Sequence, residues 1–167
     1  MGATLAVSAG EDQRYDAALR WAREFAGAFK TAAGFGVFDP SAAGVNYRLV
    51  GSASALHTPT GLNLTGAAGR TDADGGGRDT AFVDLKAGWQ ADLLSFGKTA
   101  FSIDWQQTED GAAKGDTGNS FGFAVVQNLK DYGTEFYAGL RTYDLDRDDG
   151  PSVSDIIVGT FGSRVKF

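Results

Sequence analysis

Gly159-Thr-Phe-Gly-Ser-Arg-Val-Lys-Phe167 is the stretch of sequence that decides the fold class. In an extended strand, successive side chains point to opposite faces. One face then carries mainly apolar residues: Phe161, Ser163, Val165 and Phe167. The other face carries small, polar or basic residues: Thr160, Gly162, Arg164 and Lys166. One face suits an apolar environment and the other suits water, so this stretch is predicted to be an amphipathic β-strand.

The same period of two recurs along the whole chain, between clusters of turn-forming residues, and predicts a single all-β domain over residues 1–167. Tyr15–Phe25 is the weakest case because it contains good helix formers, but its alternation favours a strand. About ten strands are expected, in antiparallel up-and-down order. They are Ala3–Ala9, Tyr15–Glu24, Ala28–Phe38, Val45–Leu56, Thr60–Arg70, Thr80–Ala91, Lys98–Gln107, Ser120–Asn128, Thr134–Asp144 and Val153–Phe167.

The connections between these strands alternate between long or acidic segments and short ones. The long set includes Thr71–Asp79, Thr108–Gly118 and Asp146–Ser152, and the short set includes His57–Thr60 and Lys130–Gly133. Barrels of the outer membrane have long external loops and tight periplasmic turns. The alternation therefore predicts a sheet whose two ends differ.

Composition excludes several classes of function. The chain has 167 residues, a net charge of -6 and no cysteine. A nucleic-acid partner is not expected, because phosphate binding needs a clustered basic surface and no Lys/Arg run occurs. Disulfides, zinc–thiolate sites and thiol nucleophiles are excluded. No run of about 18 apolar residues predicts a transmembrane helix, but a membrane β-strand needs only about 10 alternating residues.

The first ten residues do not match a secretory signal. Met1–Gly10 has no basic residue and too short an apolar stretch for that role. We read it as a strand. An exported protein would then need its signal upstream of Met1, which predicts that this chain is part of a longer one.

Alternation alone fits two kinds of fold. A membrane barrel has its apolar face outside, whereas a soluble β-sandwich or ligand-binding barrel has it inside. Aromatic residues near strand ends, charges at mid-strand and many Gly and Ala residues on the polar face favour the membrane form. The predicted aromatic girdle is Trp89, Phe101, Trp105, Phe121, Phe136 and Phe167. Phe82 is also expected at the level of this girdle. The predicted lumen-lining residues are Asp16, Arg20, Lys30, Arg48, Asp84, Lys86, Asp104, Glu135, Tyr137, Arg141 and Arg164.

Catalytic, metal and nucleotide sites are not expected. His57 is the single histidine, and no Gly-x-Ser-x-Gly elbow accompanies it, so it is read as structural. Asp144–Pro151 has alternating carboxylates but departs from the EF-hand pattern. Gly34-Phe-Gly36 lacks the third glycine of a dinucleotide fingerprint. No enzyme activity, resident metal or cofactor is predicted.

Three segments carry a resemblance to a known family: Asp92–Trp105, Phe123–Leu129 and Tyr132–Tyr143. The chain resembles the carboxy-terminal portion of Gram-negative outer-membrane porins, particularly those of alphaproteobacteria, most clearly from Thr80 to Phe167. The resemblance implies a location in the outer membrane, contact with lipid and lipopolysaccharide, passage of small polar solutes, and a homotrimer. Such porins have barrels of about 16 to 18 strands.

Ten strands are fewer than the resemblance implies. The chain is therefore expected either to close as a transmembrane β-barrel by itself or to form the carboxy-terminal segment of a larger porin barrel. The first functional hypothesis is a porin-like channel for passive diffusion of small hydrophilic solutes and ions. A second is a non-conducting structural or adhesive barrel whose acidic loops bind ions or a partner. The third is the soluble sandwich or ligand-binding barrel.

Overall fold

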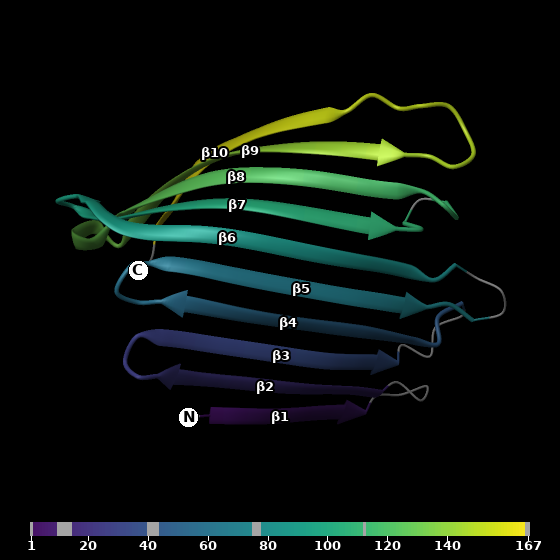
Figure 1. Cartoon of the computed structure of the whole chain (residues 1–167), viewed down its shortest axis with the longest axis horizontal. Coiled ribbons are helices and arrows are strands. Elements are labelled where there is room, and N and C mark those ends of the chain that lie inside the picture. The colour runs from purple at the N-terminus through teal and green to yellow at the C-terminus, as the bar shows by residue number, and fades with distance from the viewer. Residues whose placement is uncertain (1, 10–14, 40–43, 75–77, 112, 166–167) are drawn as a thin grey trace.

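The structure is a computed structural model that describes residues 2–9, 15–39, 44–74, 78–111 and 113–165. Ten strands form one antiparallel sheet in which each strand pairs with its neighbours in sequence (Figure 1). A 3₁₀ helix, η2 (Lys130–Tyr132), connects β8 to β9. The strands are β1 (Gly2–Ala9), β2 (Tyr15–Phe25), β3 (Phe29–Asp39), β4 (Tyr47–His57), β5 (Leu62–Asp72), β6 (Thr80–Leu94), β7 (Gly97–Glu109), β8 (Thr117–Leu129), β9 (Thr134–Asp146) and β10 (Ile156–Val165).

The predicted all-β class, strand number and up-and-down order are confirmed. Tyr15–Phe25 is a strand, although it contains good helix formers, because it pairs along its full length with β3 and from Tyr15 to Ala22 with β1. No helix within the described ranges is long and apolar enough to span a membrane.

Most strand boundaries differ from the prediction by one or two residues, and three differ by three residues. One of these is the start of β8, at Thr117 instead of Ser120, and the other two are the start of β10 and the end of β6. The last strand begins at Ile156 instead of Val153. Strand β6 continues to Leu94, so most of the predicted connection after Ala91 is strand. The pairing of β6 with β7 resumes at Leu94 and Gly97 after an irregularity in register. A two-residue turn is therefore enough to join β6 to β7.

The connections lie at two opposite ends of the sheet, as Figure 1 shows. We call the end that holds residues 73–74, 78–79, 110–111, 113–116 and 147–155 the loop end, and the end that holds residues 26–28, 58–61, 95–96 and 130–133 the turn end. Among the described connections the longer ones gather at the loop end, which agrees with the predicted alternation. Residues 10–14 and 40–43, which belong to two further predicted long connections, lie outside the described residues.

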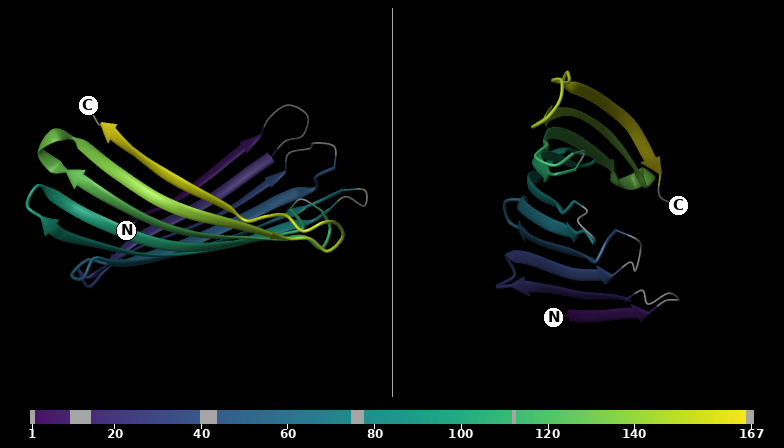
Figure 2. Two further views of the ribbon diagram at one scale, coloured as in Figure 1. Left: turned by 90° about the horizontal axis from the view of Figure 1, so that it is seen from above. Right: turned by 90° about the vertical axis from the view of Figure 1, so that its right-hand side faces the viewer.

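The sheet is open. In the pairing of the described strands, β1 joins only β2 and β10 joins only β9. Figure 2 shows the sheet curling over through β6–β10, with β1 and β10 at its two edges. Of the two expected alternatives, closure of the chain by itself is not found in these ten strands. Closure depends on curvature and on pairing between the two most distant strands, which alternation within each strand does not determine.

Strand register gives the sheet two chemically different faces, because directly paired residues of an antiparallel sheet share a face. One row of paired residues across β5–β9 is Leu64, Ala87, Ile103, Phe123 and Leu140. The adjacent row on the opposite face is Thr65, Lys86, Asp104, Gly122 and Arg141. We call these the apolar face and the polar face.

No second layer covers the apolar face. Among the described residues no hydrophobic side chain is buried, and Phe161 is 88% and Val7 71% exposed. The most buried side chains are polar or charged, including Ser120 and Glu135 on the polar face. A globular domain of this size normally buries its apolar face against another element, so the described strands leave their main hydrophobic surface free.

Candidate functional site

The polar face brings together every predicted lumen-lining residue. The register of the ten strands places all eleven side chains on this one face, although they come from seven different strands. They are Asp16 and Arg20 on β2, Lys30 on β3, Arg48 on β4, Asp84 and Lys86 on β6, Asp104 on β7, Glu135, Tyr137 and Arg141 on β9, and Arg164 on β10. Whether they line a lumen stays a prediction.

An ion pair crosses β8 near the middle of the polar face. Arg141 on β9 pairs with Asp104 on β7, and its Nη1 also donates to Ser120 Oγ at 2.9 Å. The strand between them contributes Gly122, which is directly paired with both residues. A Cβ at this position would lie 2.6 Å from Asp104 Oδ1 and 2.7 Å from Arg141 Nη2. Gly122 therefore leaves the space that the ion pair occupies.

The last two strands repeat this arrangement. Glu135 on β9 forms an ion pair with Arg164 on β10. Tyr137 lies over Gly162, its directly paired neighbour, and a Cβ there would lie 2.5 Å from the tyrosine hydroxyl. Large polar side chains thus lie across small paired residues. Ion pairs and close contacts hold these polar groups in place on the polar face.

The other half of the polar face carries more exposed charge. Arg20, Lys30, Arg48 and Lys86 are all exposed, and no ion pair within the described residues involves them. Arg20 borders a hollow of about 560 Å³ whose other walls are mostly small residues, among them Ala22, Ala32, Gly34 and Ser52. The exposed guanidinium and ammonium groups can therefore interact with small anions or water on this face.

Aromatic side chains gather on the apolar face. Trp89 and Phe101 stack with ring centroids 6.0 Å apart, and Trp105 is paired directly with Phe121. Phe136 lies on the same face, opposite Ser163. These five residues of the predicted girdle share one face, whereas Phe167 lies outside the described residues. Their role as a girdle stays a prediction.

Phe82 is on the wrong face for the proposed girdle. It is paired with Gly69 and Thr108, which places it on the polar face among Asp84 and Lys86. Gly69 provides the space for the ring. The correction follows from parity, because a residue two positions from Asp84 on a strand must share its face.

His57 contacts an aromatic ring and a threonine hydroxyl, and its structural role stays a prediction. Its ring lies 4.6 Å from that of Phe29 at the turn end, and its Nδ1 is 2.7 Å from Thr60 Oγ1. The side chains that the structure describes contain no group of three or more acidic or histidine residues arranged to hold a metal ion.

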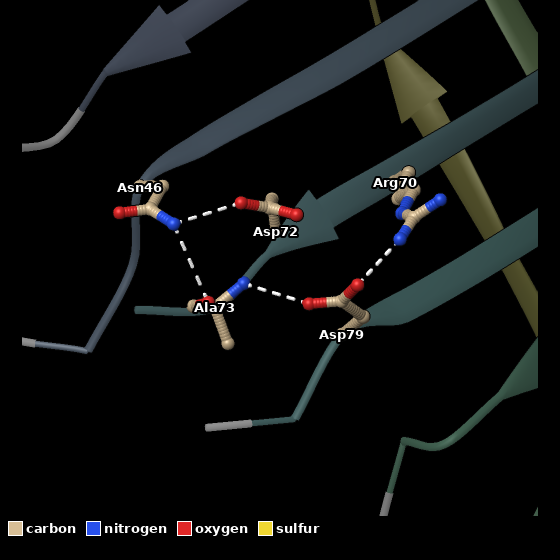
Figure 3. A network of polar contacts seen from close by, with 5 residues as sticks. All are labelled: Asn46, Arg70, Asp72, Ala73 and Asp79. Carbon is tan, nitrogen blue, oxygen red and sulfur yellow. Dashed lines mark hydrogen bonds and ion pairs between the residues drawn. The ribbon is translucent and has the colours of Figure 1, made fainter. Parts of the chain in front are cut away.

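A polar network joins described residues on either side of the connection between β5 and β6 at the loop end (Figure 3). Asn46 Nδ2 donates to Asp72 Oδ2 at 2.8 Å, and the backbone amide of Ala73 donates to Asp79 Oδ1 at 3.0 Å. Arg70 forms an ion pair with Asp79. The pKa of the Asp79 carboxyl is lowered, first by the hydrogen bond from the Ala73 amide and then by Arg70.

Neighbouring connections also contact each other at the loop end. Arg78 Nη2 donates to the Gly111 carbonyl oxygen at 3.0 Å. Asp116 is almost fully buried, and its carboxylate lies 3.8 Å from Arg147 Nε and accepts from the Asp148 amide at 3.3 Å. Three successive connections are therefore tied together at this end of the sheet.

Sequence reasoning missed the residues that depend on register, such as Ser120, Gly122 and Asp79. Alternation assigns a residue to a face, but it does not tell which residue lies opposite on the next strand. For Gly122 a signal was available, because this glycine lies in the middle of a strand whose two neighbours carry the opposite charges of Asp104 and Arg141.

Comparison of the chain with known protein families, with curated proteins and with solved structures gave no match in any of the three.

Proposed function

We propose that this chain forms the wall of a porin-like channel in the outer membrane of a Gram-negative bacterium, through which small hydrophilic solutes and ions diffuse passively. The observation that carries the proposal is the single sheet with one uncovered apolar face and one charged face. In such a wall the apolar face contacts lipid and the polar face contacts water.

Strand length supports this proposal. Strands β2 to β10 have 10 to 15 residues each. A tilted transmembrane β-strand needs about 9 to 11 residues, whereas strands of globular proteins most often have about 5 or 6. The strands therefore match the thickness of a bilayer better than they match an ordinary domain.

The chemistry of the two ends of the sheet indicates which end faces the cell exterior. The turn end has aromatic residues on the apolar face, such as Phe29, Trp89 and Phe101, as expected where a barrel meets the headgroup region. The loop end has longer, acidic and mutually connected segments. We propose that the loop end faces the cell exterior and contacts lipopolysaccharide.

A soluble β-sandwich accounts less well for the sheet. A sandwich buries two apolar faces against each other, but the described strands form a single sheet with an exposed apolar face. A non-conducting adhesive barrel shares the two-faced wall with a channel. Conductance separates these two possibilities.

The test uses two arginines on the same strand, β2, that lie on opposite faces. Arg20 is on the polar face, and Arg23 is on the apolar face with its guanidinium carbon 4.7 Å from the Phe25 ring centroid. We expect Arg20→Glu to raise the cation-to-anion permeability ratio about twofold in planar bilayers, because a fixed charge acts within about 8 Å of its position at physiological salt.

Arg23→Glu is the matched control and should leave the reversal potential unchanged. A chain that inserts without conducting would support the adhesive barrel. Equal effects of the two variants would contradict the assignment of the polar face to the water path.

A further inference from the structure

The two edges of the sheet are open and lack the features that protect edge strands. Exposed edges are usually blocked by charged side chains, proline or a bulge. β1 contains no charged residue and no proline, and β10 contains one charge, Arg164, and no proline. Their pairings with β2 and β9 run without a register shift. Both edges are therefore suited to pair with a further strand.

The directions of the two edge strands are complementary. Ten strands in up-and-down order make β1 and β10 run in opposite directions. Antiparallel pairing between a β1 and a β10 also continues both faces. Leu5 and Val7 of β1 would join the face of Ile157 and Phe161, while Thr4 and Ser8 would join the polar face.

We propose that β1 of one copy pairs with β10 of a second copy, so that two copies close a single barrel around a shared lumen. This inference rests on the proposed channel function. A two-fold axis along the barrel produces both junctions at once, because each copy contributes one β1 and one β10. Two sheets of ten strands give twenty strands.

The arrangement of the sheet favours a second copy over closure within one chain. In Figures 1 and 2, β1–β5 are stacked side by side and the curl is concentrated in β6–β10, so β1 and β10 remain at opposite edges. Closure within one chain would require β1–β5 to curl as strongly as the second half. It would also enclose eleven large polar or charged side chains in a barrel only slightly wider than one of about eight strands, which its own side chains fill.

Membrane insertion makes pairing of the edges obligatory. Unpaired backbone N–H and C=O groups are not tolerated where they face lipid, so transmembrane sheets are closed. A second copy supplies partners for both edges. The water path of the channel is incomplete without it.

The absence of cysteine in the chain allows a direct cross-linking test. Ala6→Cys on β1 and Val158→Cys, Thr160→Cys or Arg164→Cys on β10 all place the thiol on the polar face. A β1 variant and a β10 variant are refolded together in vesicles and treated with a short bismaleimide. We expect a covalent dimer from the mixture with at least one β10 variant, and none from either variant alone.

Ser52→Cys is the matched control, since it lies on the polar face of β4, inside the sheet. Its mixtures with the β10 variants should give no dimer. The Ala6→Cys, Thr160→Cys double variant should likewise link into dimers. A link formed only within monomers, or no link with any β10 variant in vesicles that contain inserted protein, would overturn the proposal and leave the channel function standing. Failure of the unmodified chain to insert would overturn both.

Discussion

At the scale of single residues, the polar face is organised by contrasts in size between paired positions. Asp104 and Arg141 meet above Gly122, and Tyr137 lies over Gly162. A side chain that lies across a glycine gains contacts that an upright one lacks, and it keeps its polar group near the backbone. Gly122 and Gly162 are therefore structural partners of the large polar side chains that lie across them.

Gly122→Ala should disturb the Asp104–Arg141 pair. The new Cβ would lie 2.6 Å from Asp104 Oδ1, so the carboxylate or the guanidinium must move. Because the atoms that must move are the ends of flexible side chains, we expect the free energy of unfolding to fall by only about 1 kcal/mol, the low end of the cost of overpacking. Urea titration of the protein in detergent micelles measures this change.

Gly118→Ala provides the control on the same strand and face. A Cβ at this position would meet its nearest heavy atom at 3.9 Å, which is an ordinary contact. Its substitution should be neutral or slightly stabilising. If both alanines destabilise the protein equally, the ion pair does not depend on the space at Gly122.

At the scale of elements, the strands and the connections differ in how far the sequence determines them. All ten strands could be predicted from the period of two, including Tyr15–Phe25, because each strand is long enough for alternation to outweigh local propensity. The contacts between connections could not be predicted. Asn46 reaches Asp72 across 26 positions of sequence, and such a contact exists only once β4 and β5 are in register.

The Asp79 network should make the protection of the Ala73 amide dependent on pH. The folded pKa of Asp79 lies below the ordinary value of 3.8, so the carboxylate stabilises the network at pH values above 3.8. This stabilisation is lost as the pH falls through the lowered pKa. We expect amide protection of Ala73 in hydrogen-exchange mass spectrometry to persist to below pH 3.8 and then to disappear.

Asp79→Asn should weaken this protection at neutral pH, because it removes the charge that pairs with Arg70 and weakens the acceptor for Ala73. Asp74→Asn, in the same connection, should leave it unchanged, since the backbone amide of Asp74 is what donates to Gly44. Equal loss in both variants would show that net charge, and not the network, accounts for the protection.

At the scale of the whole molecule, alternation predicted the chemistry of the two faces but not the closure of the sheet. The eleven predicted lumen-lining residues share one face because parity within a strand and pairing between strands act together. Whether β1 meets a β10 depends on curvature summed over ten strands and on a partner strand. Neither is encoded in a local pattern. Phe82 was assigned to the girdle although its even number places it on the same face as Asp84, so the face must be worked out for each residue.

The apolar face can be tested at its centre with two neighbouring residues of β7. Ile103 is 60% exposed on the apolar face, and Ser102 next to it lies on the polar face opposite Gly88 and Ala124. If the apolar face contacts lipid, Ile103→Arg places a charge near the bilayer midplane at a cost of about 2 to 4 kcal/mol. We therefore expect the fraction of Ile103→Arg that floats with vesicles to fall strongly, while Ser102→Arg floats like the unmodified chain. In a water-soluble protein the same arginine would reduce the exposed apolar surface and increase solubility without lipid, so higher solubility of Ile103→Arg with unchanged folding would contradict the membrane wall.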